Sequence, residues 1–195
     1  HGGRLPLNLS LMGSTQGDTT LAQEIAAEAG RTLNALRVTT TAAATDNSPL
    51  DEGSLRSSGD AAAQASISAA LTAARPEDAV LSEEAADDPR RLIAERVWII
   101  DPLDGTREFG ERDGAGVWRD DFAVHVALWE RGQGLTLGVV GLPARGVIYS
   151  SDAPPAVPAS PPGKLRIAVS RTRPPAFIAA LEAAGSAALV PMGSA

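Results

Sequence analysis

The most informative segment of the chain reads Val97-Trp98-Ile99-Ile100-Asp101-Pro102-Leu103-Asp104-Gly105-Thr106. Its first four residues are a continuous apolar run bounded by charge and by proline, which is typical of a strand covered on both faces. Asp101 and Asp104 follow where this strand would leave its sheet, and functional sites of α/β proteins form at such strand ends. The sequence therefore predicts a buried strand that carries two carboxylates into a site.

The turn after this strand has the donor atoms of a magnesium site. Asp101 and Asp104 are three residues apart on a turn fixed by Pro102, so their carboxylates can converge on one point. The Leu103 carbonyl can add a third oxygen. Hard oxygen ligands of this kind suit Mg²⁺ and suit softer metals poorly.

The next residues favour phosphate. Gly105 lets the backbone approach a ligand closely, and Thr106 stands where a short helix, Thr106 to Phe109, would begin. Free backbone amides at a helix start attract anions. A metal site and a phosphate site are thus predicted side by side.

Ser82-Glu83-Glu84 follows another short apolar strand and adds one or two further carboxylates. At an effective dielectric constant near 20, two like charges ~4 Å apart repel each other by about 4 kcal/mol. Converging acids must therefore protonate, separate or hold cations. Bound dications are the natural solution near neutral pH.

Two helices are predicted before these motifs. Apolar residues recur at helical spacing from Thr19 to Leu36, with Asp18 placed to cap the start. Residues 38–58 mix Thr, Asp, Ser, Pro and Gly without a period and are predicted to be a long mobile loop. The second helix is predicted over 60–74, where Arg75-Pro76 ends it and Asp60 is a candidate cap.

The remaining elements predict two layers. Short strands are expected at 79–81, 122–130, 135–141 and 146–150, the last three as an antiparallel meander joined by glycine-containing turns. Residues 153–163 are rich in proline and cannot join a sheet, so they are predicted to connect two subdomains. The expected division is 1–152, the connector 153–163, and 164–195, the last with a strand at 165–169, a helix at 175–184 and a strand at 188–190.

The composition narrows the function. The 195 residues are 44% hydrophobic, carry 17 Lys and Arg against 24 Asp and Glu, and have a formal charge of -7. An acidic chain without a basic stripe is a poor ligand for a nucleic acid polymer, whereas a small phosphorylated substrate can bind through cations. The absence of cysteine excludes disulfides and thiolate metal sites. No apolar run approaches the ~18 residues that span a bilayer, so a soluble, cytoplasmic protein is expected.

The string Asp-Pro-Leu-Asp-Gly-Thr after an apolar strand, preceded by Glu-Glu, resembles the signature of the inositol monophosphatase superfamily. Gly59-Asp60 resembles the acidic residue at the start of that family's second helix. The segments 81–84, 98–109 and 169–173 are most similar to the CysQ branch of the superfamily. The resemblance covers residues 18–195. It implies an α/β fold in layers (an α+β sandwich), the sugar-phosphatase-like fold, with the second subdomain truncated in this chain.

The resemblance also implies a Mg²⁺-dependent phosphomonoesterase with two or three metal ions. The positions that match the family's metal ligands are Glu83, Asp101, the Leu103 carbonyl and Asp104. Asp60 and Thr106 match the pair that orients and deprotonates the attacking water, so catalytic roles are expected for Asp60, Thr106 and Glu83. Direct attack by an activated water, without a covalent phosphoenzyme, is the mechanism that the resemblance implies.

The leading substrate is adenosine 3',5'-bisphosphate, from which the CysQ branch removes the 3'-phosphate. Inositol 1-phosphate and fructose 1,6-bisphosphate are the alternatives that the same metal core would accept. Inhibition by lithium is expected with the family. The positions expected to contact substrate are Gly105, Thr106, Ser170, Arg171, Gly193 and Ser194.

One family feature does not occur in this chain: the later Trp-Asp motif, whose Asp completes the second metal site. The chain is therefore also interpreted as a piece of a longer protein. A second hypothesis for it is a metal- or phosphate-binding fragment without turnover, and a third is a structural fragment with an incidental acidic cluster. A homodimer is left open.

Several polar residues have simpler explanations than a role in chemistry. His125 lies in an alternating strand, where a packed or half-exposed histidine is more common than a catalytic one. Arg107 and Arg171 are more often solvated loop charges than phosphate ligands. Glu84 is as well explained as an exposed residue after a strand as it is as a ligand.

Overall fold

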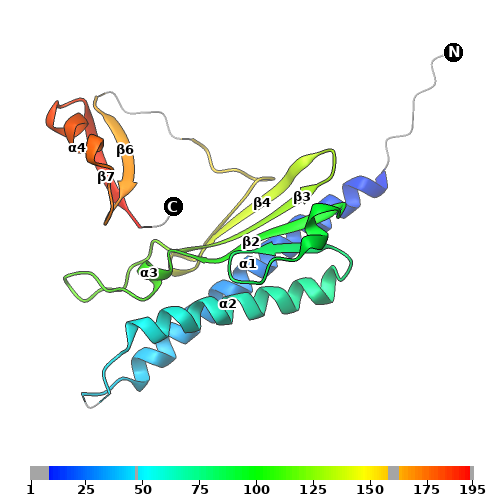
Figure 1. Ribbon diagram of the computed structural model, residues 1–195, viewed down its shortest axis with the longest axis horizontal. Coiled ribbons are helices and arrows are strands. Elements are labelled where there is room, and N and C mark those ends of the chain that lie inside the picture. The colour runs from blue at the N-terminus through cyan, green and yellow to red at the C-terminus, as the bar shows by residue number, and fades with distance from the viewer. Residues whose placement is uncertain (1–8, 47, 158–162, 194–195) are drawn as a thin grey trace.

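The computed structural model of the protein describes residues 9–46, 48–157 and 163–193, with side chains from Gly17 onward (Figure 1). In this part of the chain the larger sheet has five strands in the order β1-β2-β3-β4-β5, with the bounds Ala79–Ser82, Arg96–Asp104, Ala123–Glu130, Gly134–Leu142 and Val147–Ser150. Strands β1 and β2 are parallel, and each later pair is antiparallel. The short 3-10 helix Pro143–Arg145 (η2) joins β4 to β5. The predicted meander is confirmed.

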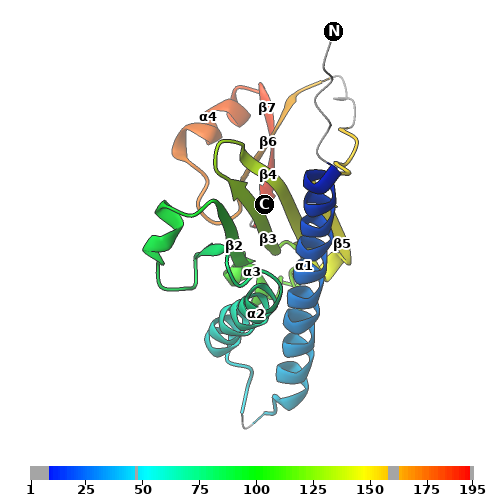
Figure 2. The ribbon, with the colours of Figure 1, turned by 90° about the vertical axis from the view of Figure 1, so that its right-hand side faces the viewer.

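Two long helices, α1 (Leu9–Ala43) and α2 (Glu52–Ala74), pack against each other and against one face of this sheet (Figure 2). Along β2 and β3, successive side chains point alternately toward the helices and away from them, as in any sheet with helices on one face. The other face is less covered: Ile99 is partly exposed while Trp98 is fully buried. The core between helices and sheet includes Leu33, Ile67, Trp98, Ile100, Val124, Val126 and Leu128.

The first helix is longer at both ends than its sequence pattern predicts. The prediction that Asp18 caps its start is wrong, since Asp18 lies inside α1, is buried, and forms ion pairs with Arg75 and Arg96. At the other end the apolar period stops near Leu36 because the last turns extend past the sheet into solvent (Figure 1). There the Thr41 hydroxyl donates to the Arg37 carbonyl at 2.7 Å, which lets a threonine stay helical.

The predicted loop 38–58 is mostly helix, and the second helix starts well before Asp60. Its cap is Asp51, whose side chain accepts a hydrogen bond from the Gly53 amide at 3.0 Å. The Gly- and Ser-rich stretch after it is helical because Leu55 is buried in the core and Gly59 packs against the Phe109 ring. Asp60 is therefore an interior residue of α2 and no cap, and only residues 44–51 connect the two helices.

Strand β2 carries the decisive segment and ends irregularly. Its register with β3 shifts between Asp101 and Asp104, so the backbone bulges where the two aspartates lie. The short helix α3 (Thr106–Phe109) follows at once, as predicted. A 3-10 helix, η1 (Pro89–Leu92), leads from β1 toward β2.

A second, two-stranded sheet follows the proline-rich segment. The strands β6 (Leu165–Ser170) and β7 (Ala187–Met192) are parallel, and α4 (Ala176–Ala183) connects them. Both strands and the helix lie where the sequence predicts them. The described residues thus form an α/β structure in layers, in agreement with the predicted fold class. No helix in the described residues combines the length and apolarity needed to cross a membrane.

Candidate active site

Strand β1 ends beside Ile100 of the parallel strand β2, so the acidic residues after β1 lie near those in the last part of β2, a region here called the carboxylate edge. The Glu83 amide donates to the Ile100 carbonyl at 3.2 Å, which places Glu83 beside the strand position that precedes Asp101. The Asp101 carboxylate accepts from the Leu103 amide at 3.2 Å and so closes the bulge. Two predicted ligand positions from different strands are therefore neighbours.

The pKa of Asp101 reflects the nearby negative charges. Burial, together with the negative charges of Glu83 and Asp104, raises the pKa of Asp101 from 3.8 to about 6. His125 and the Leu103 amide act in the opposite direction and do not outweigh them. A carboxyl group in such surroundings gains from a nearby cation, which favours its ionised form.

The Thr106 hydroxyl connects this edge to α2. Its oxygen lies 3.1 Å from Asp60 Oδ1 and 3.1 Å from the Leu103 carbonyl oxygen. A hydroxyl has one proton, so it donates to one of these acceptors at a time and keeps its lone pairs for another donor. The predicted Asp60 and Thr106 pair is thus brought together from sequence positions far apart.

Asp60 and Glu84 border an open crevice beside α2. Its volume is about 470 Å³, and its lining residues are Ser57, Asp60, Ala61, Gln64, Ala65 and Glu84. Burial, and then the charge of Glu83, raises the pKa of Asp60, although the hydrogen bond from Thr106 lowers it. Burial raises the pKa of Glu84 as well, followed by the charges of Asp60 and Glu83. The crevice therefore has an acidic wall.

Two positions at this edge, Gly105 and Gly59, require glycine. Gly105 precedes α3 with φ at 85°, a left-handed conformation that residues with a side chain rarely adopt. On α2, a Cβ at Gly59 would lie 2.6 Å from the Phe109 ring, so only glycine lets α2 approach α3 this closely. This approach is what brings Asp60 to Thr106.

Arg37 of α1 holds the other end of α3. It is buried, and its guanidinium donates to the Phe109 carbonyl at 2.6 Å and to the Arg119 carbonyl at 3.0 Å. The guanidinium carbon also lies within 4.9 Å of the ring centres of Phe109, Trp118 and Phe122. Burial lowers the pKa of Arg37 from its ordinary value to about 10, still far above neutrality. Arg37 thus fixes the last turn of α3, and the sequence analysis missed it.

His125 is a second residue that the sequence analysis set aside. It is half-buried, as expected, and lies opposite Asp101 in the register of β2 and β3. Its Nε2 lies 3.1 Å from Asp104 Oδ2. The hydrogen bond with Asp104 raises the pKa of His125 against the effect of burial, and the charges of Asp104 and Asp101 add to it. A prediction that paired 97–104 with 122–130 in register would have found this contact.

The predicted substrate contacts of the second sheet are engaged with protein atoms. The Ser170 hydroxyl accepts from the Arg173 amide at 3.2 Å. Arg171 forms ion pairs with Glu108 and Asp121, two acidic residues that the sequence analysis did not single out. The Gly193 amide donates to Asp121 at 2.7 Å. Ser194 lies outside the described residues.

Two further results bear on the ligand predictions. Arg107 forms an exposed pair with Glu111 at 3.5 Å, one turn along the chain. Among the described residues, no three Asp, Glu or His side chains are already gathered as a ligand group for a metal ion. The ligand set Glu83, Asp101, Leu103 and Asp104 therefore stays a prediction.

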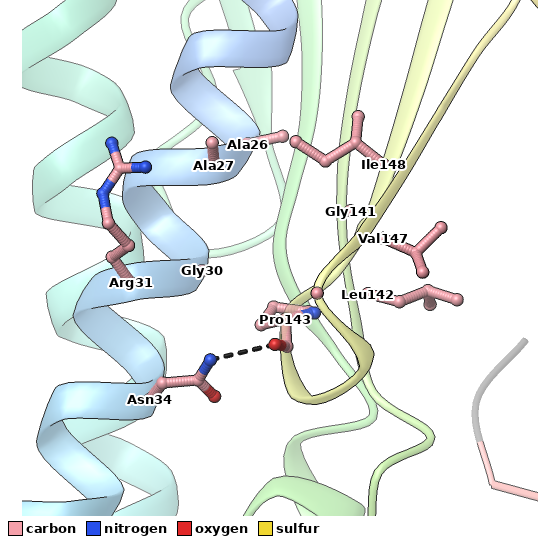
Figure 3. Close-up of a pocket in the computed structure, with 11 residues that line it drawn as sticks. Ala26, Ala27, Gly30, Arg31, Asn34, Gly141, Leu142, Pro143, Val147 and Ile148 are labelled. Carbon is pink, nitrogen blue, oxygen red and sulfur yellow. Dashed lines mark hydrogen bonds between the residues drawn. The ribbon is translucent and has the colours of Figure 1, made fainter.

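A better-formed cavity lies elsewhere, between α1 and the segment from β4 to β5 (Figure 3). It has a volume of about 250 Å³ and is lined mainly by small and apolar residues. Asn34 closes one side by donating to the Pro143 carbonyl at 2.9 Å, and Arg31 at the rim is paired with Glu28. Because none of the described residues that line it is acidic, this cavity does not suit the chemistry of the carboxylate edge.

Comparison with known proteins identifies the family of the chain. The profile of the inositol monophosphatase family matches residues 15–155, and the chain belongs to this family. The 3'-phosphoadenosine 5'-phosphate phosphatase of Mycobacterium bovis is 53% identical over 131 residues, which are 64% of this chain and 47% of that protein. The protein of the same name from Mycobacterium leprae is 46% identical over 173 residues, covering 83% of this chain and 59% of that protein.

A solved structure agrees with the fold. CysQ from Bacteroides thetaiotaomicron, described as a bacterial member of the inositol monophosphatase family, superposes with a TM-score of 0.67 at 24% identity. The superposition covers 91% of this chain and 73% of that one. The chain spans about half the length of the curated relatives it matches, with 47% and 59% of the two mycobacterial proteins covered.

Proposed function

We propose that the protein hydrolyses a small phosphomonoester with Mg²⁺ and that adenosine 3',5'-bisphosphate is its preferred substrate. The observation that carries the proposal is the Thr106 hydroxyl, which lies 3.1 Å from Asp60 at the edge where Asp101 has its pKa raised to about 6. The names of the mycobacterial relatives support the choice of substrate. The division into a subdomain 1–152, a connector 153–163 and a second subdomain from 164 is part of the same proposal.

The residues at the carboxylate edge fit a magnesium ion. All the proposed donors, from Glu83, Asp101, the Leu103 carbonyl and Asp104, are hard oxygens. The raised pKa of Asp101 marks negative charge that the protein itself leaves uncompensated. When bound, the metal would neutralise this charge and lower the pKa of a water molecule, so that hydroxide is available near neutral pH.

The protein's own residues would orient the attacking water and take its proton. With Asp60 ionised, its carboxylate accepts the Thr106 proton, and the Thr106 oxygen accepts a hydrogen bond from the water. As the water attacks phosphorus, its proton passes to Thr106 while the Thr106 proton passes to Asp60. The bond from phosphorus to the ester oxygen breaks, and the leaving oxygen takes a proton from solvent. Burial raises the pKa of Asp60, which makes it a stronger base than an exposed aspartate.

The phosphate group would lie against the turn at Gly105. The left-handed backbone at this glycine directs the chain into α3, whose first amides are available to an anion. We assign Gly105 and Thr106 to the phosphate, and Ser170, Arg171, Gly193 and Ser194 to the remainder of the substrate. Inhibition by Li⁺ belongs to the proposal and is tested by adding Li⁺ to the assay.

The test is phosphate release by the protein encoded by the complete gene. Adenosine 3',5'-bisphosphate, inositol 1-phosphate and fructose 1,6-bisphosphate are compared with and without Mg²⁺. Asp104→Asn should lower the rate roughly a hundredfold or more. Glu95→Gln is the matched control, since Glu95 precedes the same strand and its side chain is 78% exposed.

Each outcome decides a different part of the proposal. Release that depends on Mg²⁺, prefers the nucleotide and disappears in Asp104→Asn supports it entirely. Preference for inositol or fructose phosphate overturns the substrate and keeps the mechanism. Absence of release from all three compounds overturns the enzymatic proposal in favour of a binding protein.

A further inference from the structure

A polar cluster outside the carboxylate edge joins the second sheet to α3. It consists of Glu108 in α3, Asp121 before β3, Arg171 after β6 and Gly193 after β7, and is here called the Asp121 cluster. The Arg171 guanidinium donates to Asp121 and, at 3.5 Å, to Glu108. The Gly193 amide donates to the same Asp121 oxygen at 2.7 Å. One carboxylate oxygen therefore holds both strand ends.

The two acids of the cluster are buried, which makes their hydrogen bonds costly to lose. Glu108 is 7% exposed and Asp121 is 8% exposed. Burial works to raise the pKa of Asp121, but the hydrogen bonds from Arg171 and Gly193 outweigh burial and hold this pKa below its ordinary value. Removal of the accepting oxygen would leave a guanidinium and an amide without their partner in a protected place.

The fit around Gly193 leaves no space for a side chain. A Cβ on this residue would lie 2.7 Å from Glu108 Cδ and 2.8 Å from Asp121 Oδ2. The two strand ends are also joined to each other, because the Arg171 amide donates to the Met192 carbonyl at 2.8 Å. The ends of β6 and β7 thus act as one rigid edge that is seated on Glu108 and Asp121.

The ends of β6 and β7 are adjacent to residues that are proposed to bind the phosphate. Glu108 is two residues beyond Thr106 in the same short helix, and Ser170 directly precedes Arg171. The position of the strand ends relative to α3 therefore fixes the distance between the phosphate contacts and the contacts to the rest of the substrate. The Arg171 guanidinium is paired inside the cluster, so the substrate contact assigned to Arg171 depends on this seating.

We propose that Asp121 is a positioning residue that seats the ends of β6 and β7 on α3 and so gives the site its preference for a nucleotide over a minimal phosphomonoester. The inference rests on the proposed function. A small substrate needs only the carboxylate edge and α3. A nucleotide needs in addition the correct placement of the second sheet.

The test compares two substrates in four proteins. The substrates are adenosine 3',5'-bisphosphate and p-nitrophenyl phosphate, and the proteins are the unsubstituted full chain, Asp121→Ala, Asp121→Asn and Asp120→Ala. Asn keeps an acceptor oxygen for Arg171 and Gly193, so it should rescue the function that Ala removes. Asp120 is the matched control, because it is the neighbouring acid and its side chain is 60% exposed in a pair with Arg145.

We expect Asp121→Ala to lower kcat/KM for the nucleotide at least tenfold, mainly through KM, and to change kcat/KM for p-nitrophenyl phosphate less than threefold. Asp121→Asn and Asp120→Ala should stay within threefold of the unsubstituted protein on both substrates. Equal losses on both substrates would reduce Asp121 to a structural residue and overturn the inference. Nucleotide activity unchanged in Asp121→Ala would overturn it too.

A second measurement does not need activity and so separates this inference from the proposed function. Hydrogen–deuterium exchange without substrate should be faster in Asp121→Ala than in Asp120→Ala for peptides covering 106–110 and 187–193. Exchange equal in the two variants would show that Asp121 does not seat the strand ends. If the exchange differs as expected but no compound is hydrolysed, the proposed function fails while the seating of the strand ends stands.

Discussion

The two ends of strand β2 differ in whether their acidic residues form ion pairs with arginine. At its start Arg96 forms ion pairs with Asp18 at 2.7 Å, Asp78 at 3.1 Å and Glu130 at 2.7 Å, and Arg75 adds a second pair to Asp18 at 2.7 Å. At its far end, within the described residues, Asp60, Glu83, Glu84 and Asp101 form no ion pair with arginine or lysine, and Asp104 contacts His125. One end is compensated, and the other is left negative.

We interpret this difference as a division between acids that stabilise the fold and the acids assigned to the proposed site. Buried charges that serve structure are paired, because an unpaired charge in a protected place is expensive. At the far end of β2, Asp60, Glu84 and Asp101 form no such ion pair within the described residues, and burial together with neighbouring negative charge raises the pKa of each. Such unfavourable charge would be relieved by a bound cation, as the proposed function requires.

The largest expected effect comes from Asp101→Asn at the uncompensated end. It should lower Mg²⁺-dependent phosphate release at least about a thousandfold, which corresponds to roughly 4 kcal/mol. In the presence of a chelator the same change should raise the thermal midpoint of unfolding, because it removes repulsion with Glu83 and Asp104. Kinetics and thermal unfolding of the one variant measure both.

The combination of lower activity and higher stability is what distinguishes the two ends. Calorimetric titration with Mg²⁺ should also show weaker binding to Asp101→Asn. A variant that is less stable than the unsubstituted protein in chelator would mean that Asp101 is a structural acid like those at the start of β2, and the comparison would break.

The next effect is on stability at the compensated end. Asp18 is 2% exposed, and Asp18→Ala leaves two guanidinium groups without one of their partners. The free energy of unfolding should fall by about 3 kcal/mol in chemical denaturation. Glu28→Ala in the same helix is the control, since its pair with Arg31 is exposed and is worth about 0.5 kcal/mol. Similar losses in the two variants would refute the idea of a compensated buried end.

How far the sequence predicts these two ends depends on how local the information is. The segment 97–106 predicts β2, the turn and α3 because an apolar run, a proline and a glycine each act on the nearest residues. The partners of Arg96 come from α1, β3 and the residue before β1, and such pairing is visible only when the tertiary fold is known. The carboxylate edge was therefore predictable, and the compensated end was not.

The two helices show the same limit. Residues 52–59 contain Gly and Ser that favour a loop locally, yet the burial of Leu55 and the contact of Gly59 with Phe109 make them helical. Tertiary packing decides such cases against local propensity. The contact of His125 with Asp104 and the role of Asp121 were not predicted for a related reason: each depends on a partner from another element.

A smaller effect is expected in the pH dependence of stability. The pKa of Asp101 is raised from 3.8 to about 6 in the folded protein, so the folded state binds a proton more tightly than the unfolded state between these values. The free energy of unfolding of the metal-free protein should therefore fall as the pH rises from 3.8 to about 6. The fall should be larger than in Asp101→Asn, by about 1 kcal/mol.

Thermal unfolding of both proteins in chelator, at a series of pH values, measures this difference. Saturating Mg²⁺ should remove it, since a bound cation lowers the pKa of Asp101 and stabilises the folded state by mass action. If the stability of the two metal-free proteins changed with pH in the same way, the negative charges near Asp101 would not raise its pKa as inferred.

The smallest effect concerns His125, which supplies the positive charge next to Asp104. The hydrogen bond with Asp104 raises the pKa of His125, so the ring is largely protonated at pH 6 and competes with a metal ion for the same negative charge. His125→Gln keeps a hydrogen-bond donor and loses the charge. It should therefore bind Mg²⁺ about two- to fivefold more tightly than the unsubstituted protein at pH 6, a change of less than about 1 kcal/mol, and the difference should become smaller as the pH rises. Titration calorimetry at a series of pH values measures the difference in Mg²⁺ affinity.

Weaker binding of Mg²⁺ to His125→Gln at pH 6 would contradict this prediction. It would mean that His125 orients Asp104 toward the metal instead of competing with the metal, so that one acid at the far end of β2 has a structural partner.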